Sequence, residues 1–153
     1  MSVQNPAEID PSASSGTGQQ ALGAAAMMER DLASDSAGVV VTSIGDGTAE
    51  ATMTIRDDMA NGHGITHGGF VFLLADTAFA CACNDAQAVT VAAGADITFL
   101  AATRPGDVLT ARAARRSARG RSGIYDVTVT RREADTEQVI AEFRGRSRTL
   151  PAR

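Results

Sequence analysis

The sequence predicts a single α+β domain in which a long antiparallel sheet curls around one central helix, and two observations carry that prediction. The first is the segment GGFVFLLADTAFACACN at residues 68–84, which contains good helix formers and is apolar around its whole circumference. Such a helix must be buried on all sides, by a sheet or by a sheet and a partner subunit. The second is a series of strand-like segments separated by tight turns, which favour antiparallel pairing over crossover connections.

The chain's 153 residues are enough for one domain with a sizeable core. Residues 1–19 are rich in Ser, Gly, Pro and Gln, so we expect a disordered leader there. The domain itself is predicted to span residues 20–150. It should begin with a short helix, which the pattern ALGAAAMMERDLA favours from Gln20 to about Ala33.

Strands are predicted on both sides of the central helix. Two precede it and should pair as a hairpin across the turn Gly45-Asp46-Gly47. Four follow it, separated by turn signals such as Arg104-Pro105-Gly106-Asp107. The predicted strands cover residues 39–42, 49–55, 88–101, 107–118, 122–132 and 138–149.

Composition argues against several classes of protein. The formal charge of −4 gives no overall electrostatic reason to expect nucleic acid as a partner. No stretch approaches the roughly 20 apolar residues of a membrane span, and the polar N-terminus is unlike a secretory signal, so we expect a cytoplasmic protein without a membrane partner. Cys81 and Cys83 lie two apart in a helical run, where a disulfide cannot close, and are interpreted as buried thiols.

Basic residues gather in one segment, and two interpretations of them stay open. A cluster of this kind is typical of a solvated strand and turn. Guanidinium groups also match phosphate geometry, so the same cluster predicts a site for a phosphorylated ligand. The residues concerned are Arg112, Arg115, Arg116, Arg119 and Arg121.

Asp76 is the most informative residue, because a carboxylate in the middle of an apolar helix is unfavourable unless something polar or reactive meets it. One interpretation is a structural acid satisfied by a backbone group or an arginine. The other is a base or nucleophile. We expect burial to raise the pKa of Asp76, unless Thr77, a neighbouring Asn or a helix terminus hydrogen-bonds the ionised form. Thr77 alone is interpreted as a hydroxyl that bonds back to a helix carbonyl.

The loop Asn61-Gly62-His63-Gly64-Ile65-Thr66-His67 runs directly into this helix. The free amides of Gly68 and Gly69 at the helix N-terminus can polarise a carbonyl as an oxyanion hole. His63 and His67 are four apart, but no further Cys or His completes a metal site, so none is expected. His67 is instead interpreted as shaping an acyl pocket or orienting the loop.

Spacing along the helix sets a geometric demand. Gly68 and Asp76 are eight positions apart, which is about 12 Å along a helix axis. A reacting carbonyl needs both groups within about 3 to 3.5 Å, so one of them must come from another copy of the chain. Two antiparallel central helices related by a two-fold axis would supply two equivalent sites. The sequence therefore predicts a homo-oligomer.

The motif NGHGITHGG followed by FVFLLADTAFACACN resembles the phenylacetyl-CoA thioesterase (PaaI-type) branch of the hotdog acyl-CoA thioesterases. Segments ITFLAATRPGDVLTARA, GIYDVTVT and IAEFRGRSR are also similar to that family, and the resemblance covers roughly residues 25–149. It implies the hotdog fold, a dimer of dimers, and coenzyme A lying along the subunit interface as part of the substrate. It implies no metal and no separate cofactor.

Carried over by position, the resemblance implies that Asp76 attacks an acyl-CoA thioester or activates water for the attack. The Gly68 amide would polarise the thioester carbonyl, and Asn61 and His67 would line the site. Two departures from the family pattern, at Gly94 to Phe99 and at Ala101 to Arg104, adjoin the acyl pocket. The residues expected to contact the substrate are Gly69, Phe72, Thr77, Arg104 and Arg116.

The acyl group stays open at this point. An aryl or phenylacetyl group is the expectation inherited from the family, while short or medium aliphatic, hydroxybenzoyl and hydroxyphenylacetyl groups are alternatives. Two other functions are also considered. A hotdog enoyl-CoA hydratase should carry a loop Asp and His pair, and a non-catalytic acyl-CoA sensor should carry a DNA-binding segment. This sequence instead places its acid, Asp76, on the central helix, and we expect no room in it for another domain.

Overall fold

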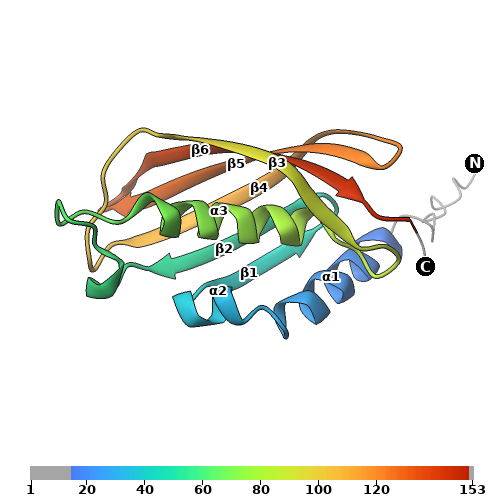
Figure 1. Ribbon diagram of the computed structural model, residues 1–153, viewed down its shortest axis with the longest axis horizontal. Helices are drawn as coiled ribbons and strands as arrows, with labels where there is room; N and C mark the ends of the chain where they lie inside the picture. Colours follow the sequence, from blue (N-terminus) through green and yellow to red (C-terminus); the bar gives the residue numbers. More distant parts are fainter. Residues whose placement is uncertain (1–14, 152–153) are drawn as a thin grey trace, which may run out of the picture.

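A computed structural model describes residues 15–151 and shows a curved antiparallel sheet with one long helix across its concave face (Figure 1). In that range the sheet runs in the order β1-β2-β4-β5-β6-β3. Helix α3, Gly68–Cys83, lies over it, and α1, Ser15–Met28, and α2, Leu32–Ala37, lie beside β1. The strands are β1 Val40–Gly45, β2 Thr48–Thr54, β3 Thr90–Phe99, β4 Val108–Arg119, β5 Ser122–Glu133 and β6 Thr136–Thr149. The α+β prediction is confirmed, and so is the predicted order of strands along the chain, two before α3 and four after it.

The N-terminal part differs from the single helix predicted at 20–33. Two helices are present instead, because Asp31 caps the start of α2 by accepting a 2.9 Å hydrogen bond from the Ser34 amide. Gly38, at φ 74°, ends that helix in the left-handed conformation. Helix α1 begins at Ser15, five residues before the predicted start. The rest of the predicted leader, residues 1–14, lies outside the described range.

The core lies between α3 and the concave face of the sheet. Phe79 of α3 packs against Tyr125 and Phe143, with ring centroids 5.5 and 5.9 Å away. Strand β6 comes so close to this ring that a Cβ on Gly145 would lie 2.8 Å from it. Alternation along β4, β5 and β6 directs small and apolar side chains to this face, as a half-buried strand requires.

The convex face of the sheet carries charged side chains that pair across strands. Arg144 of β6 bonds Asp126 of β5 at 2.6 and 2.9 Å, and Arg112 of β4 bonds both Glu50 and Glu137. Exposed pairs of this kind contribute little to stability but keep the face soluble. Most of the charge of the sheet is therefore on the side away from α3.

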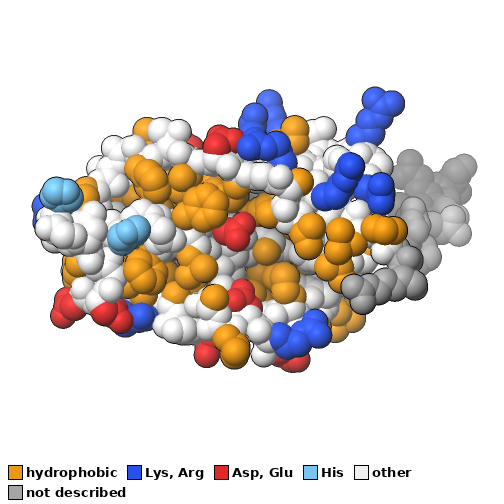
Figure 2. All heavy atoms as spheres, in the orientation of Figure 1, with side chains coloured by type: hydrophobic (Ala, Val, Ile, Leu, Met, Phe, Trp, Pro, Cys, Tyr) orange, Lys and Arg blue, Asp and Glu red, His pale blue; other side chains and the backbone are white. Residues whose placement is uncertain are grey.

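Burial of α3 on all sides, as predicted, is incomplete in one chain. A stripe at helical spacing stays partly accessible, and it consists of Gly69, Leu73, Asp76, Ala80 and Cys83. Figure 2 shows this side of the molecule, where acidic side chains lie among hydrophobic ones. Beside the stripe, β3 forms one edge of the sheet and is paired with β6 alone.

Candidate active site

The N-terminus of α3 presents one free backbone donor. His67 is the N-cap, and its Nδ1 accepts a 3.0 Å hydrogen bond from the Gly69 amide. The expectation that the Gly69 N–H is free is therefore wrong. The Gly68 N–H has no hydrogen-bond partner within residues 15–151. Because Nδ1 is an acceptor, the neutral His67 ring carries its proton on Nε2. The His67 side chain therefore caps the start of α3, and its role in shaping the acyl pocket or orienting the loop stays a prediction.

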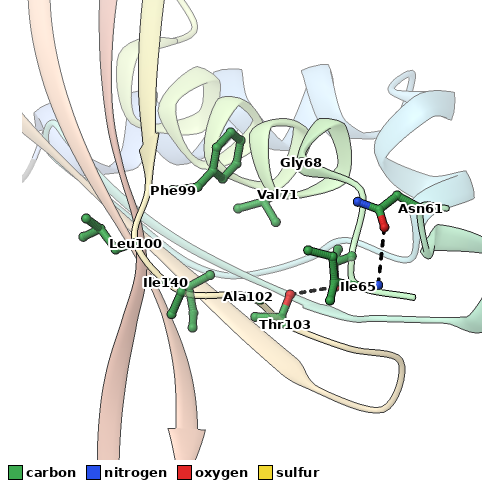
Figure 3. Close-up of a pocket in the computed structure, with 11 residues that line it drawn as sticks. Asn61, Ile65, Gly68, Val71, Phe99, Leu100, Ala102, Thr103 and Ile140 are labelled. Carbon is green, nitrogen blue, oxygen red and sulfur yellow. Dashed lines mark hydrogen bonds between the residues drawn. The ribbon is translucent and has the colours of Figure 1, made fainter. Parts of the chain in front are cut away.

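Asn61 shapes the loop that precedes the helix. Its backbone N–H donates to Ile65 O at 2.8 Å, and its side-chain Oδ1 accepts from the His63 amide at 2.8 Å. The Asn61 Nδ2 has no partner in the described part of the chain. Figure 3 shows this nitrogen on the side of the pocket near Gly68 and Val71. Asn61 therefore offers a free donor beside the Gly68 amide.

A pocket of about 420 Å³ opens between this loop, the start of α3 and the end of β3. Asn61 and Gly68, two of the predicted site residues, both line it (Figure 3). The Thr103 hydroxyl donates to Thr66 Oγ1 at 2.6 Å, so neither hydroxyl needs a polar group on a ligand. The remaining wall is mostly apolar and includes Ile65, Val71, Phe99, Leu100 and Ile140. This pocket suits an apolar group attached to a carbonyl.

Phe99 was expected near the acyl pocket only as the end of the segment Gly94 to Phe99, and sequence reasoning missed its contact with Gly68. Its side chain is 52% exposed, although it is the last residue of a strand that faces α3. The ring lies against Gly68, and a Cβ on Gly68 would be 2.8 Å from Phe99 Cζ. The sequence signal was an aromatic residue just before a loop, which is too common to identify a site. Only the folded chain shows why residue 68 has no side chain.

Asp76 lies half-buried at the middle of α3, with no hydrogen-bond or ion-pair partner within residues 15–151. Burial raises the pKa of the Asp76 carboxyl, and the negative charge of Asp31 raises it further. The interpretation as a structural acid satisfied by arginine or backbone is not supported. Asp76 is an ionisable group that the described part of a single chain leaves without a partner.

Thr77 does not hydrogen-bond Asp76. Its hydroxyl donates to Leu73 O at 2.8 Å, as the alternative interpretation predicted, and contacts Ser34 Oγ at 2.8 Å. Thr77 is 4% exposed, so it is part of the packing between α3 and its neighbours and does not line an open site in this chain. Phe72 is half-buried and packs edge-on against Phe143 at 5.2 Å, on the sheet side of α3.

Gly68 and Asp76 are not brought together within one chain. Gly68 is the first residue of α3 and lines the pocket, whereas Asp76 stands two turns further along the partly accessible stripe. Their separation along the axis is about 12 Å, as the helical rise requires. One carbonyl cannot contact both groups from a single subunit.

The predicted phosphate contacts fall into two groups. Arg112 and Arg115 are engaged with acids, Arg115 with Asp46 at 3.2 Å. Arg104 and Arg116 are exposed and form no ion pair within residues 15–151. Arg104 precedes β4, whereas Arg116 lies within that strand, and eight residues at about 3.3 Å each place Arg116 roughly 26 Å from Val108. Arg104 and Arg116 of one chain cannot hold the same phosphate.

The two cysteine thiols of α3 are not reactive near neutral pH. Burial raises the pKa of the Cys81 thiol to about 11 and that of Cys83 to about 12, so both stay protonated near neutrality.

Within residues 15–151, neither histidine joins a group of three or more side chains able to hold a metal ion. Every helix in the same range is too short or too polar to span a bilayer.

Comparison with known proteins identifies the family. The family model of the Thioesterase superfamily matches residues 63–137. The acyl-coenzyme A thioesterase PaaI of Escherichia coli is 40% identical over 125 residues, which are 82% of this chain and 87% of the relative. This chain belongs to the PaaI-type hotdog thioesterases. The resemblance inferred from NGHGITHGG and ADTAFA is confirmed, and the chain is a thioester hydrolase.

Solved structures of PaaI-type thioesterases share this fold. The E. coli PaaI protein from the phenylacetic acid degradation operon superposes with a TM-score of 0.83 at 37% identity, covering 90% of this chain and 97% of that one. A mutant form of the phenylacetic acid degradation protein PaaI from Thermus thermophilus gives a TM-score of 0.71 at 28% identity, over 76% and 97% of the two chains. The hydratase and sensor alternatives gain no support from these relatives.

Proposed function

We propose that this thioesterase hydrolyses acyl-CoA thioesters to a free acid and CoA, at a site that two subunits share. One observation carries the proposal: the free Gly68 N–H and the unsatisfied Asp76 carboxylate lie on one helix, about 12 Å apart, with only the first beside the pocket. A partner subunit with its α3 antiparallel would bring its Asp76 to this Gly68. The relative in E. coli acts on acyl-coenzyme A, as its name states.

The proposed reaction uses both groups on one thioester. The Gly68 N–H donates to the carbonyl oxygen, and its bond strengthens as negative charge develops there. The Asp76 carboxylate of the partner then either takes a proton from water, which attacks the carbonyl carbon, or attacks that carbon itself to form a mixed anhydride, which water hydrolyses to release the acid and restore the carboxylate. The carbon–sulfur bond breaks, and the CoA thiolate leaves and is protonated. Water is the second substrate, and the reaction requires no metal or organic cofactor.

The exposed surface beside the pocket favours a second copy as the missing partner. The stripe along α3 is apolar apart from Asp76, and β3 is an unpaired edge of ten residues. Val91 and Phe99 on that strand are 40% and 52% exposed. A dimer would cover these groups and desolvate Asp76 further. A dimer of dimers is the assembly we predict, and a cytoplasmic location stays a prediction.

The pocket supports an aryl or phenylacetyl group as the acyl part of the substrate. Its wall is apolar, and the Phe99 ring offers an aromatic face next to the reacting carbonyl. Two PaaI relatives are described by phenylacetic acid degradation. Arg104 and Arg116, which hold no ion pair in the described chain, are available to the CoA phosphates, each from a different subunit.

A thiol-release assay across a panel of acyl-CoA esters tests the proposal directly. The panel contains phenylacetyl-, benzoyl-, 4-hydroxybenzoyl- and hexanoyl-CoA. We expect the largest kcat/KM for an aryl or phenylacetyl ester. A preference for hexanoyl-CoA would overturn the acyl assignment, and no release from any CoA ester would overturn the substrate class.

Mixed dimers test the shared site. Asp76→Ala and Gly68→Val chains should each be inactive alone, because each lacks one half of both sites. After subunit exchange, a mixed dimer regains one intact site, so activity should recover to at most half that of an equal amount of wild-type dimer. No recovery after exchange has been verified would contradict the shared site.

A further inference from the structure

A second carboxylate, that of Asp31, is linked to α3 through Ser34 and Thr77, the residue that follows Asp76. Burial is the largest cause of the raised pKa of Asp76. The second is the negative charge of Asp31, which lies between α1 and α2. Two acids of like charge on a mostly apolar surface repel each other, and this fold brings them together through a specific contact between α2 and α3. N-capping alone does not require the cap to face another acid. The arrangement calls for a reason beyond helix capping.

A buried polar chain holds Asp31 in place. The Ser34 amide donates to Asp31 Oδ1 at 2.9 Å, and the Ser34 hydroxyl donates to Oδ2 at 2.6 Å. Ser34 Oγ lies 2.8 Å from Thr77 Oγ1, on the residue that follows Asp76. Ser34 is 1% exposed and Thr77 is 4% exposed. The Ser34 amide and the Ser34 hydroxyl both donate to Asp31, as a carboxylate requires, and the Thr77 hydroxyl donates to Leu73 O.

We propose that Asp31 is a positioning residue for thioester hydrolysis: its carboxylate, fixed against α3 by Ser34 and Thr77, favours transfer of a proton from water to Asp76. This inference rests on the proposed role of Asp76. A general base works best when its pKa lies near the working pH. A fixed negative charge nearby raises the pKa of a carboxylate without contacting the substrate.

Other charged groups near α3 do not compete with Asp31. On the strands packed against α3, the charged side chains lie mainly on the convex face, in pairs such as Arg144 with Asp126. The Arg115 and Asp46 pair stands beside Cys83, at the far end of the helix. In the turn between α1 and α2 and on α2 itself, three further charged side chains are exposed, and none of them contributes to the pKa shift of Asp76: Glu29, Arg30 and Asp35. On α3 itself, the Cys81 and Cys83 thiols are neutral near pH 7.

The test removes the charge of Asp31 while keeping its cap. Asp31→Asn retains an N-cap oxygen for the Ser34 amide, and Asp31→Ser is a second neutral cap should the first variant fold poorly. Asp35→Asn is the matched control, because it removes one exposed acid from the same helix without touching Ser34. The carboxyl carbon of Asp76 is titrated by NMR in each dimer and assigned with Asp76→Asn. The pH profile of kcat/KM is recorded alongside it.

We expect the Asp76 titration midpoint to move to lower pH in Asp31→Asn and Asp31→Ser, and to stay in place in Asp35→Asn. The acidic limb of kcat/KM should move with it, and the plateau rate should fall because the base is weaker. An unmoved midpoint, or an equal shift in Asp35→Asn, overturns the inference. A shifted midpoint with an unshifted acidic limb keeps the Asp31 effect on Asp76 but overturns the proposed role of Asp76 as base.

Discussion

The two ends of α3 are built in opposite ways. At the C-terminal end every polar group that the fold buries has a partner: Asn84 Nδ2 donates to Ala80 O and Thr90 O at 3.0 and 2.9 Å, and Asn84 Oδ1 accepts from the Thr90 amide at 2.9 Å. Gln20 of α1 donates through its Nε2 to the Ala82 carbonyl oxygen of α3. At the N-terminal end, the Gly68 amide and the Asn61 Nδ2 face a pocket with no partner in the described chain.

That difference separates stability from function along a single helix. Buried polar groups that are paired hold the elements together, and their loss is unfavourable because the remaining partner is left without a bond. Donors that are left free beside an apolar pocket add nothing to the folded chain and are available to a ligand. The middle of the helix, with the unsatisfied Asp76, behaves like the N-terminal end.

The largest expected effect is at Asp76. Asp76→Asn should lower kcat by about 10²- to 10⁴-fold, since a positioned general base contributes that much. Its fold and assembly should stay intact, because the carboxylate makes no bond that the amide would lose. The measurement is steady-state thiol release on the best substrate, with the oligomeric state checked by sedimentation. Activity within threefold of the wild type would remove Asp76 from the chemistry.

Gly68→Ala comes next. The added Cβ would lie 2.8 Å from Phe99 Cζ, so the ring must move away from the start of the helix. We expect kcat/KM to fall by roughly 10- to 100-fold, the order of loss caused by misplacement near 1 Å. Gly18→Ala on α1 is the control, because nothing lies within 4 Å of its Cβ. Equal effects of the two variants would show that the Gly68 position is not special.

A matched pair of asparagines sharpens the comparison between the two ends. Asn84→Ala should lower the free energy of unfolding by about 1–3 kcal/mol, because it strands the buried Thr90 amide. Its activity per folded protein should be unchanged. Asn61→Ala should do the reverse, with a lower kcat/KM and a smaller loss of stability, since its loop is more accessible. Urea unfolding at fixed protein concentration and thiol release together distinguish the two. Similar outcomes for both variants would break the division proposed between the ends.

The smallest effect concerns stability and pH. The pKa of Asp76 is raised in the folded state, so ionising this group disfavours folding. Asp76→Asn should therefore be more stable than the wild type at neutral pH. The advantage should shrink as pH falls below the raised pKa and vanish below about 3.9, the ordinary value for Asp, where both states are protonated. Unfolding curves between pH 4 and 8 check this, and an advantage that grows toward acid would contradict the sign.

Much of this architecture could be predicted because its signals are local. The all-round hydrophobicity of residues 68–84 specified the central helix, and turns such as Gly45-Asp46-Gly47 specified the order of the antiparallel strands. Asp76 was found because an acid in an apolar run is an exception to burial rules. Asn61 and Gly68 were found because a glycine-rich loop enters the helix there, and both line the pocket.

The missed features depend on contacts between distant segments. Phe99 covers Gly68 across 31 positions, and no local pattern indicates such a contact. The split between α1 and α2 was missed because Asp31 was not considered as an N-cap, and its approach to Asp76 depends on how α2 packs on α3. His67 accepts a hydrogen bond from the Gly69 amide in a side-chain rotamer that the sequence does not specify.

The burial of the two cysteines has a practical consequence at the bench. With pKa values of about 11 and 12, Cys81 and Cys83 are thiolates to about one part in a thousand and one part in ten thousand at pH 8. Disulfide reagents that detect released CoA react with thiolates, so the folded enzyme should contribute almost no colour of its own. A slow rise in signal without substrate would then report unfolding, which makes each activity assay its own measure of how much protein remains native.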